Sequence, residues 1–335
     1  MKNPLVSILM PAYNHAKYIR QAIDSAVNQT YENIEIIISD NASTDGTTEI
    51  IKSYTDKRIR ANFFSENHGI VVNGQYCLEQ AQGEYLGCLF TDDYWDVTKI
   101  EKQVAVFEKN KELGAVFTHA QIRNDDGGIE GLDNHPLKQV FIQPNRTQAQ
   151  WLRHFFYFEN CLCAPSALII TEDYKKILIN GISHGLRQLS DFSAWIQLVK
   201  QKPIHIIQED LTYHRVRNDF GNMSASTREN AVRHINEMKM ILQEFFDDMP
   251  EDLFLSAFSG DFVKKGSLTA EELCCEKVFL FRMRHIPIFC EKIYDLLKDP
   301  ALRNVLKTVY NFSFDRFYEL TASYVCIDVQ TSGAR

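Results

Sequence analysis

Two adjacent carboxylates, Asp92 and Asp93, follow a short apolar run at residues 85–90 after a single threonine. A run of this length and composition is typical of a buried β-strand. A buried strand that ends in paired acids places oxygen ligands at the edge of a sheet, where open α/β folds bind their ligands. Paired carboxylates suit a hard divalent cation, which can in turn hold a phosphate-bearing substrate. The alternative interpretation is a solvated Asp-Asp turn that binds no metal.

The elements around this pair predict an α/β fold. Further apolar runs occur at residues 6–10, 34–38, 60–65 and 115–118, and segments with a helical spacing of apolar residues lie between them. The alternation implies right-handed crossovers and a mostly parallel central sheet flanked by helices. Because the polar loops all follow the carboxyl ends of strands, they are expected to gather along one edge as the ligand site.

Two familiar nucleotide-binding patterns are missing from the sequence. No Gly-x-Gly-x-x-Gly follows the first predicted strand, and no Walker-type Gly-Lys-Ser/Thr occurs anywhere. Dinucleotide-binding and P-loop proteins are therefore disfavoured.

Composition and charge indicate an ordinary globular protein. The chain has 335 residues, of which 45% are hydrophobic and 24% charged, and its formal net charge is -8. This charge argues against nucleic acid as a partner of the whole chain. The eight cysteines contain no Cys-x-x-Cys pair, which indicates free thiols in a reducing compartment. Without a signal-peptide pattern or an apolar run of ~20 residues, we expect a cytoplasmic protein, either free or peripheral at the inner face of the cell membrane.

The pattern changes at about residue 227. Strand signals stop there, and long helical segments follow at 235–246, 270–281 and 286–297. We therefore expect an α-helical C-terminal extension at residues 227–335. The basic and aromatic stretch at 277–298 favours the core of a helical region, and contact with a membrane surface or with a second copy of the chain is the alternative.

Several linked segments resemble the nucleotide-sugar-binding half of family 2 glycosyltransferases. They read, in order, PLVSILMPAYN, AIDSAVNQTYENIEIIISDNASTDGTTEII, NHG and GEYLGCLFTDDYWDVTKIEKQ. The resemblance is specific over residues 4–120 and continues more weakly, through LSDFSAWIQL and YHRVRNDFGNMS, to about residue 226. It implies a GT-A fold, with the nucleotide-sugar-binding half at 1–120 and the acceptor-binding half at 121–226. It also implies metal-dependent transfer of a sugar from a nucleoside diphosphate, with inversion at the anomeric carbon.

The resemblance assigns roles to polar residues after the first two predicted strands. Pro11 and Tyr13 would border the nucleobase, and a plain helix-entry turn is the alternative for Tyr13. Asp40 and Asn41 match a motif that usually reads Asp-Asp and contacts the base, and the Asn41 amide oxygen can still accept a hydrogen bond from a base N–H. Asp45, in Ser-Thr-Asp-Gly, is expected to cap the next helix.

Asp92 and Asp93 match the acidic motif of the family, although many members carry another Asp at the position of Phe90. The resemblance implies Mn²⁺ or Mg²⁺, held by one or two acids together with diphosphate oxygens and water. Asp93 is expected to be a direct ligand, and Asp92 to lie nearer the ribose or the sugar. Such a cation would neutralise the leaving diphosphate.

Asp191 lies where the family carries a Glu-Asp motif whose Asp is the general base, with Ser190 in place of the Glu. An inverting transfer needs this carboxylate on the acceptor side; the alternative is that Ser190 or Asp191 only caps a helix. Arg215 matches the Arg of a Tyr-Arg-x-His segment, and Arg217 stands where His is usual; both are expected to contact the nucleotide-sugar. Arg217 cannot bind a cation but can hold phosphate oxygens bidentately; otherwise it is a solvated loop arginine.

The donor implied by family frequency is a UDP-sugar, and the acceptor is a hydroxyl of a growing glycan or a lipid-linked glycan in cell-surface polysaccharide biosynthesis. Departures from the family pattern at Phe90, Asn41, Ser190 and Arg217 keep a second hypothesis open. In this alternative the chain binds a nucleotide-sugar as a partner subunit and has lost transfer.

Overall fold

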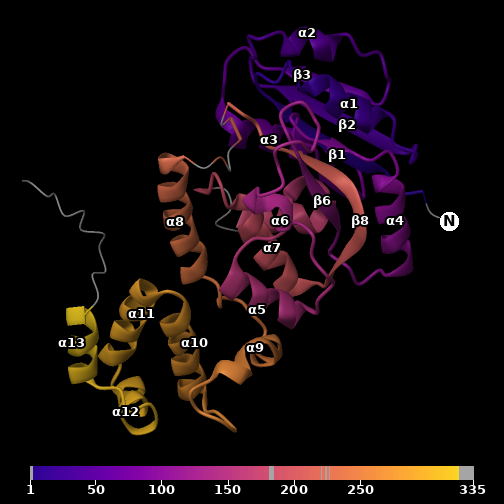
Figure 1. Ribbon diagram of the computed structural model, residues 1–335. Helices are drawn as coiled ribbons and strands as arrows, with labels where there is room; N and C mark the ends of the chain where they lie inside the picture. Colours follow the sequence, from indigo (N-terminus) through magenta and orange to yellow (C-terminus); the bar gives the residue numbers. More distant parts are fainter. Residues whose placement is uncertain (1–2, 181–184, 220, 223–224, 226, 324–335) are drawn as a thin grey trace, which may run out of the picture. The chain divides into compact units, whose positions relative to one another are not determined.

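The polypeptide divides between Glu237 and Met238 into two units, Met1–Glu237 and Met238–Arg335. The computed structural model in Figure 1 describes residues 3–180, 185–219, 221–222, 225 and 227–323. The division lies within helix α8 (Arg228–Gln243). The boundaries expected from the sequence, after residues 120 and 226, stay predictions.

A mixed eight-stranded sheet forms the centre of the first unit. Its strands lie in the order β3-β2-β1-β4-β7-β6-β8-β5. Parallel pairing joins β3 to β2, β2 to β1, β1 to β4 and β6 to β8, whereas β4 and β6 pair with β7, and β8 with β5, in antiparallel fashion. The predicted parallel core is therefore confirmed, with antiparallel strands inserted in the second half. The strands are β1 (Val6–Ala12), β2 (Ile34–Asp40), β3 (Ile59–Phe63), β4 (Tyr85–Cys88), β5 (Tyr94–Trp95), β6 (Ala115–Arg123), β7 (Leu168–Ile170) and β8 (Ile204–Arg215).

Continuous apolar strands and one-sided helices explain this arrangement. Every residue of β2 is buried, as expected for a central parallel strand that is covered on both faces. In α1, Ile19, Ala22, Ile23 and Ala26 are buried at helical spacing. The helices of this unit that precede α8 are α1 (Ile19–Val27), α2 (Thr47–Lys52), α3 (Gly69–Gln80), α4 (Lys99–Lys109), α5 (Gln148–Phe158), α6 (Thr171–Asn180) and α7 (Ser190–Gln201).

Strand register decides which polar groups share an edge. Ala12 at the end of β1 lies opposite Asp40 at the end of β2, and Phe63 at the end of β3 lies opposite Asp40 as well. On the other side of β1, Leu9 pairs with Cys88, the last residue of β4. The loops that follow β1, β2 and β4 therefore leave the sheet at the same edge, as the sequence predicted.

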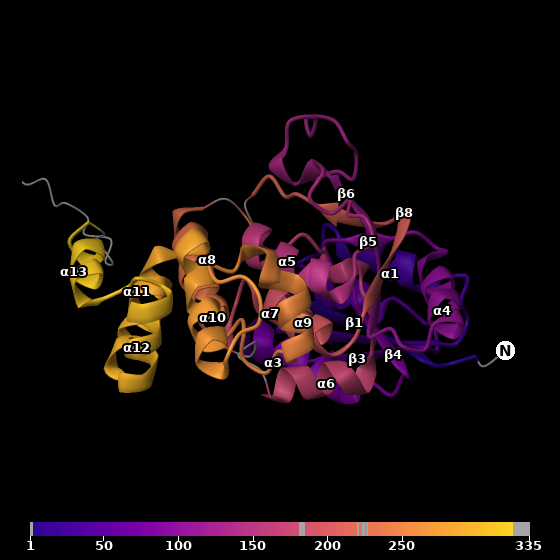
Figure 2. The same ribbon diagram turned by 90° about the horizontal axis from the view of Figure 1, so that it is seen from below.

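Within its described residues, 238–323, the C-terminal unit consists of helices joined by turns and loops, so the prediction of a helical region is confirmed. Figures 1 and 2 show no strand among α9 to α13. Aromatic side chains pack in its core; for example, Phe279 stacks on Tyr310 with ring centroids 4.9 Å apart. Much of the 277–298 stretch is buried, including Phe281 and Phe289, which supports the core interpretation. The helices are α9 (Glu251–Phe258), α10 (Ala270–Arg284), α11 (Ile286–Lys298), α12 (Pro300–Val309) and α13 (Phe314–Ser323).

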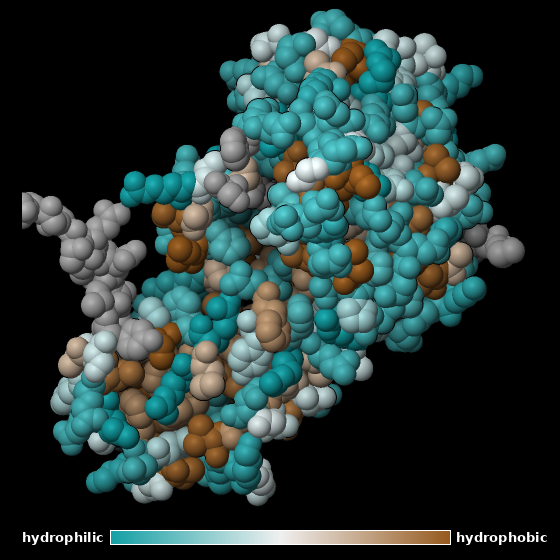
Figure 3. Space-filling model, in the orientation of Figure 1, coloured by the Kyte–Doolittle hydropathy of each residue, from teal (hydrophilic) through white to brown (hydrophobic). Residues whose placement is uncertain are grey.

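The surface is mainly hydrophilic on the face drawn in Figure 3, where smaller hydrophobic patches interrupt it. In the part of the chain that the structure describes, no helix has both the length and the apolar character that a bilayer span requires.

Candidate functional site

The two acids after β4 are tied to the end of β8. The Arg215 backbone N–H donates to Asp93 Oδ1 over 2.8 Å, and His214 Nδ1 lies 3.2 Å from Asp93 Oδ2. The Asp93 N–H donates to the Phe90 carbonyl at 2.9 Å, which closes a tight turn. With its side chain fully buried, Asp93 joins the first half of the sheet to the second. The structure thus brings Asp93, 122 residues from Arg215 in sequence, and its neighbour Asp92 onto the predicted Arg-containing segment.

Asp92 lies beside Arg217. The Arg217 guanidinium approaches the Asp92 carboxylate to 3.8 Å, and Asn222 Nδ2 donates to the same carboxylate at 3.4 Å. Burial and the neighbouring Asp93 raise the pKa of Asp92, while His214 and Arg217 act in the opposite direction. The site therefore holds two close carboxylates whose repulsion is only partly offset by protein cations.

Arg217 is also held by two other groups. Its Nε and NH2 donate to the Asp219 carboxylate at 3.1 and 2.6 Å. Its NH1 lies 2.9 Å from His15 Nε2, and His15 Nδ1 lies 2.6 Å from the Thr91 hydroxyl. Burial and then the Arg217 charge lower the pKa of His15 to about 4, so the imidazole is neutral and accepts from Arg217. Arg217 is therefore not the solvated loop arginine of the alternative interpretation.

His15 was missed as a site residue by the sequence interpretation. The signal available was its place directly after the turn that ends β1, where ligand-binding loops of such sheets begin. The contact with Arg217 joins residues 202 positions apart, which no local pattern reveals.

Arg215 is buried and its guanidinium is occupied by protein acceptors. Nε donates to the Asp92 carbonyl at 2.8 Å, and NH2 donates to Gln21 Oε1 at 2.6 Å. NH1 donates to the carbonyls of Asn124 and Asp125 at 3.2 and 2.8 Å. Arg215 thus positions the backbone of the acidic turn, and direct contact of its guanidinium with a donor stays a prediction.

Asp40 and Asn41 shape the loops at the other end of this edge. The Asp40 carboxylate accepts hydrogen bonds from Ser43 and Thr48, and its side chain is buried. Asn41 Oδ1 accepts from the His68 N–H at 2.9 Å, and its Nδ2 donates to Asn67 Oδ1 at 2.9 Å. The Asp40 side chain therefore holds the loop that follows β2, whereas the Asn41 side chain holds the loop between β3 and α3. Their contacts with a base stay predictions.

The turn after β1 leaves an aromatic ring accessible beside these loops. Tyr13 is 44% exposed, and Pro11 is partly buried within β1. Asp45 accepts from the Ala16 N–H at 2.9 Å and from the Thr47 N–H at 3.1 Å, so that it links this turn to α2. The expectation that Asp45 is the N-cap is wrong by one position, because Gly46 occupies that place.

Asp191 lies in the first turn of α7. Its Oδ1 accepts from the Phe192 N–H at 2.7 Å and its Oδ2 from Asn160 Nδ2 at 3.2 Å. The N-cap of this helix is Leu189, without a side-chain cap, so the view that Ser190 or Asp191 serves only as the cap is wrong. Burial raises the pKa of Asp191 to about 6, which brings a carboxylate close to the range of a general base.

The thiol of Cys163 interacts electrostatically with both Asp191, the candidate base, and Asp93 of the acidic turn. Burial raises the pKa of Cys163, and the negative charges of Asp93 and Asp191 raise it further. Both carboxylates are therefore within electrostatic reach of Cys163. The acids predicted from distant segments share one region of the first unit.

The candidate metal ligands are Asp92 and Asp93. A carboxylate oxygen has two lone pairs, so Asp93 can coordinate a cation while it accepts from Arg215 and His214. Among the described residues, no group of three or more His, Cys, Asp and Glu side chains is arranged to hold a metal ion. The pair fits a hard cation as part of a ligand set completed by substrate oxygens and water, which is common for Mg²⁺.

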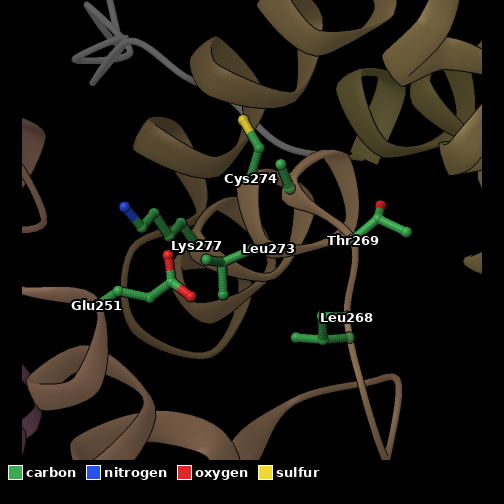
Figure 4. A pocket seen from close by; sticks show the side chains of 7 residues that line it. Glu251, Leu268, Thr269, Leu273, Cys274 and Lys277 are labelled. Atoms are coloured by element: carbon green, nitrogen blue, oxygen red, sulfur yellow. The ribbon is translucent and has the colours of Figure 1, made fainter.

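A separate pocket lies within the C-terminal unit. Figure 4 shows Glu251 and Lys277 on one side of it and Leu268 and Thr269 on the other, with Cys274 from α10. None of the site residues predicted from the sequence lines this pocket. Its mixed lining suggests no chemistry of its own.

A profile of the family described as Glycosyl transferase family 2 matches residues 7–175. The chain belongs to glycosyltransferase family 2. A chondroitin synthase of Pasteurella multocida is 31% identical over 67% of this chain, which spans only 25% of that protein. An Escherichia coli protein named UDP-Glc:alpha-D-GlcNAc-diphosphoundecaprenol beta-1,3-glucosyltransferase is 29% identical over 71% of this chain and 86% of its own.

A solved structure with a similar fold is that of S. aureus TarS 1–349 in complex with UDP-GlcNAc. It aligns with a TM-score of 0.58 at 17% identity, over 94% of this chain and 88% of that chain. The likeness supports the GT-A fold predicted for this family 2 glycosyltransferase.

Proposed function

We propose that this family 2 glycosyltransferase transfers a sugar from a UDP-sugar to a hydroxyl of a glycan or lipid-linked glycan, with inversion at the anomeric carbon, in the synthesis of a cell-surface polysaccharide. The observation that carries the proposal is that Asp93 of the acidic pair and the partly buried Asp191, from distant segments, both lie within electrostatic reach of Cys163. The names of the similar proteins, which include a UDP-Glc-dependent transferase and a UDP-GlcNAc complex, favour a UDP-sugar as the donor.

In this scheme Asp191 accepts the proton of the acceptor hydroxyl as its oxygen bonds to the anomeric carbon. The bond from that carbon to the diphosphate oxygen breaks, and UDP leaves on the opposite side. Mn²⁺ or Mg²⁺, held through Asp93 and Asp92, would supply Lewis-acid stabilisation of the leaving diphosphate. Arg217 would supply a planar cation for phosphate oxygens, and Tyr13 a surface for the base. Asp40 and Asn41 hold the two loops, after β2 and after β3, that would border the base.

The proposal is tested by thermal-shift measurements with nucleotides and nucleotide-sugars, each with and without Mn²⁺. A true ligand raises Tm because it binds only the folded chain. At a hundredfold excess over Kd it raises the free energy of unfolding by about 2.7 kcal/mol. We expect UDP and at least one UDP-sugar to stabilise the protein, more strongly with Mn²⁺, and UDP to be released from that sugar. Stabilisation without any release, even in the presence of glycan acceptors, would favour the binding-only partner subunit.

Arg217→Gln is expected to weaken UDP binding about 10- to 100-fold, because a hydrogen bond to a charged group is worth roughly 1.5–3 kcal/mol. Isothermal titration with UDP measures the change. Asp219→Asn should shift the affinity in the other direction, since Asp219 pairs with the same guanidinium and is itself 57% exposed. Arg316→Gln, on an exposed pair with Glu319, is the control. An unchanged Kd for Arg217→Gln would remove this arginine from the donor site.

A further inference from the structure

A buried carboxylate of α8 holds the segment that leads into α7. Glu237 accepts hydrogen bonds from the backbone N–H groups of Arg187, Gln188 and Leu189, at 2.9, 2.8 and 2.9 Å. These three residues directly precede Ser190 and Asp191 in the chain. Glu237 is only 6% exposed, so the bonds form away from bulk water, and bonds to an ionised acceptor are stronger than those between neutral groups.

A second contact from α8 reaches Glu159, which directly precedes Asn160, the residue whose side chain binds Asp191. His234, about one helical turn before Glu237, places Nε2 3.1 Å from the Glu159 carboxylate. Glu159 ends α5 with φ 68° and ψ -161°, a backbone conformation that is essentially confined to glycine. A non-glycine residue stays there only where its surroundings fix it, and such residues cluster at active sites.

Glu159 is followed in the chain by Asn160, whose side-chain amide binds Asp191. Asn160 Oδ1 accepts from the Leu162 N–H at 3.0 Å, which leaves Nδ2 to donate to Asp191 Oδ2 at 3.2 Å. The orientation of the Asn160 amide is thus fixed by the backbone. The two carboxylate oxygens of Asp191 are in turn assigned, one to Asn160 and one to the Phe192 N–H.

We infer that Glu237 and His234 of α8 are positioning residues for Asp191. Glu237 fixes the backbone at 187–189 ahead of the carboxylate, and His234 fixes Glu159 beside Asn160. This inference rests on the proposed function, in which Asp191 takes the acceptor proton. Proton transfer demands close geometry, and a displacement of 1 Å costs about 10²-fold in rate.

Glu237→Gln tests the inference, because the glutamine amide places an NH₂ group against N–H donors. We expect kcat for UDP release from UDP-GlcNAc, or from whichever UDP-sugar the thermal-shift screen identifies, to fall by about 10²-fold. The Kd for UDP should stay within about twofold, since Glu237 acts through Asp191 and not on the nucleotide. Glu229→Gln is the matched control, on the same helix with its carboxylate 79% exposed, and should match the wild type.

Hydrogen–deuterium exchange of the peptide that covers residues 187–189 gives a readout that needs no activity. These amides should be protected in the wild type and in Glu229→Gln, and should exchange faster in Glu237→Gln. If the variants show this exchange pattern but the wild type has no activity, the proposed function is refuted, whereas the contact of Glu237 with the 187–189 amides is supported. If Glu237→Gln does not fold, Glu237→Asp, whose carboxylate is one methylene shorter, takes its place with the same expectations.

Two results would overturn the inference. The first is an unchanged kcat in a variant whose 187–189 amides exchange faster. The second is a parallel loss of kcat and of UDP affinity, which indicates general damage to the fold and not the positioning of Asp191.

Discussion

Asp191→Asn is expected to lower kcat for transfer by about 10²–10⁴-fold, the usual contribution of a positioned general base. The substitution keeps the size of the side chain and removes its ability to accept a proton at neutral pH. The Kd for UDP should change by less than about twofold, because the proposed base acts on the acceptor and not on the nucleotide. Steady-state kinetics and titration with UDP separate the two quantities.

The pH dependence of the wild type provides a second check on Asp191. Burial raises the pKa of this carboxyl to about 6, and only the deprotonated form can accept a proton. The kcat should therefore fall as the pH drops below about 6, by about tenfold for each further pH unit. The residual activity of Asp191→Asn should lack this dependence.

A suitable control for Asp191→Asn is Asp295→Asn, which alters an exposed carboxylate that pairs with Lys298 in the C-terminal unit. Its kinetics should match the wild type. Full activity of Asp191→Asn, with an unchanged pH profile, would exclude Asp191 as the base.

Asp93→Asn should abolish the enhancement of UDP binding by Mn²⁺ and lower kcat by about 10²–10³-fold, since a Lewis acid at the diphosphate is worth several kcal/mol. The asparagine oxygen can still accept from the Arg215 N–H, so the end of β8 should keep its place. Titration of UDP with and without Mn²⁺ measures the effect.

Asp92→Asn offers a comparison at the neighbouring position. If Asp93 is the direct ligand, Asp92→Asn should reduce the enhancement of UDP binding by Mn²⁺ less than Asp93→Asn does. Asp92 lies beside Arg217. Equal Mn²⁺ enhancement in the wild type and Asp93→Asn would contradict a ligand role for Asp93.

Several site residues make their contacts with segments that are distant in the sequence, and local sequence patterns do not predict such contacts. Arg215 was read as a donor contact, yet its guanidinium lies among the carbonyls of Asp92, Asn124 and Asp125. No role was assigned to His15 from the sequence, yet it contacts Arg217. In both cases the side chain type allows more than one role, and the contacts that it makes within the protein depend on acceptors from distant segments.

The sequence by itself determined the strands β1, β2, β3, β4 and β6 with the helices between them, the edge at which Asp40, Asp92 and Asp93 lie, and the helical nature of the C-terminal unit. These features follow from the spacing of apolar residues and from the rule that parallel strands end at a common edge, which are local properties of the chain. Only the tertiary structure decided that Glu237 holds the segment before Asp191 and that Asn160 orients its carboxylate. Such pairings depend on how distant segments pack, because each side chain binds whichever complementary group the fold brings within hydrogen-bonding distance.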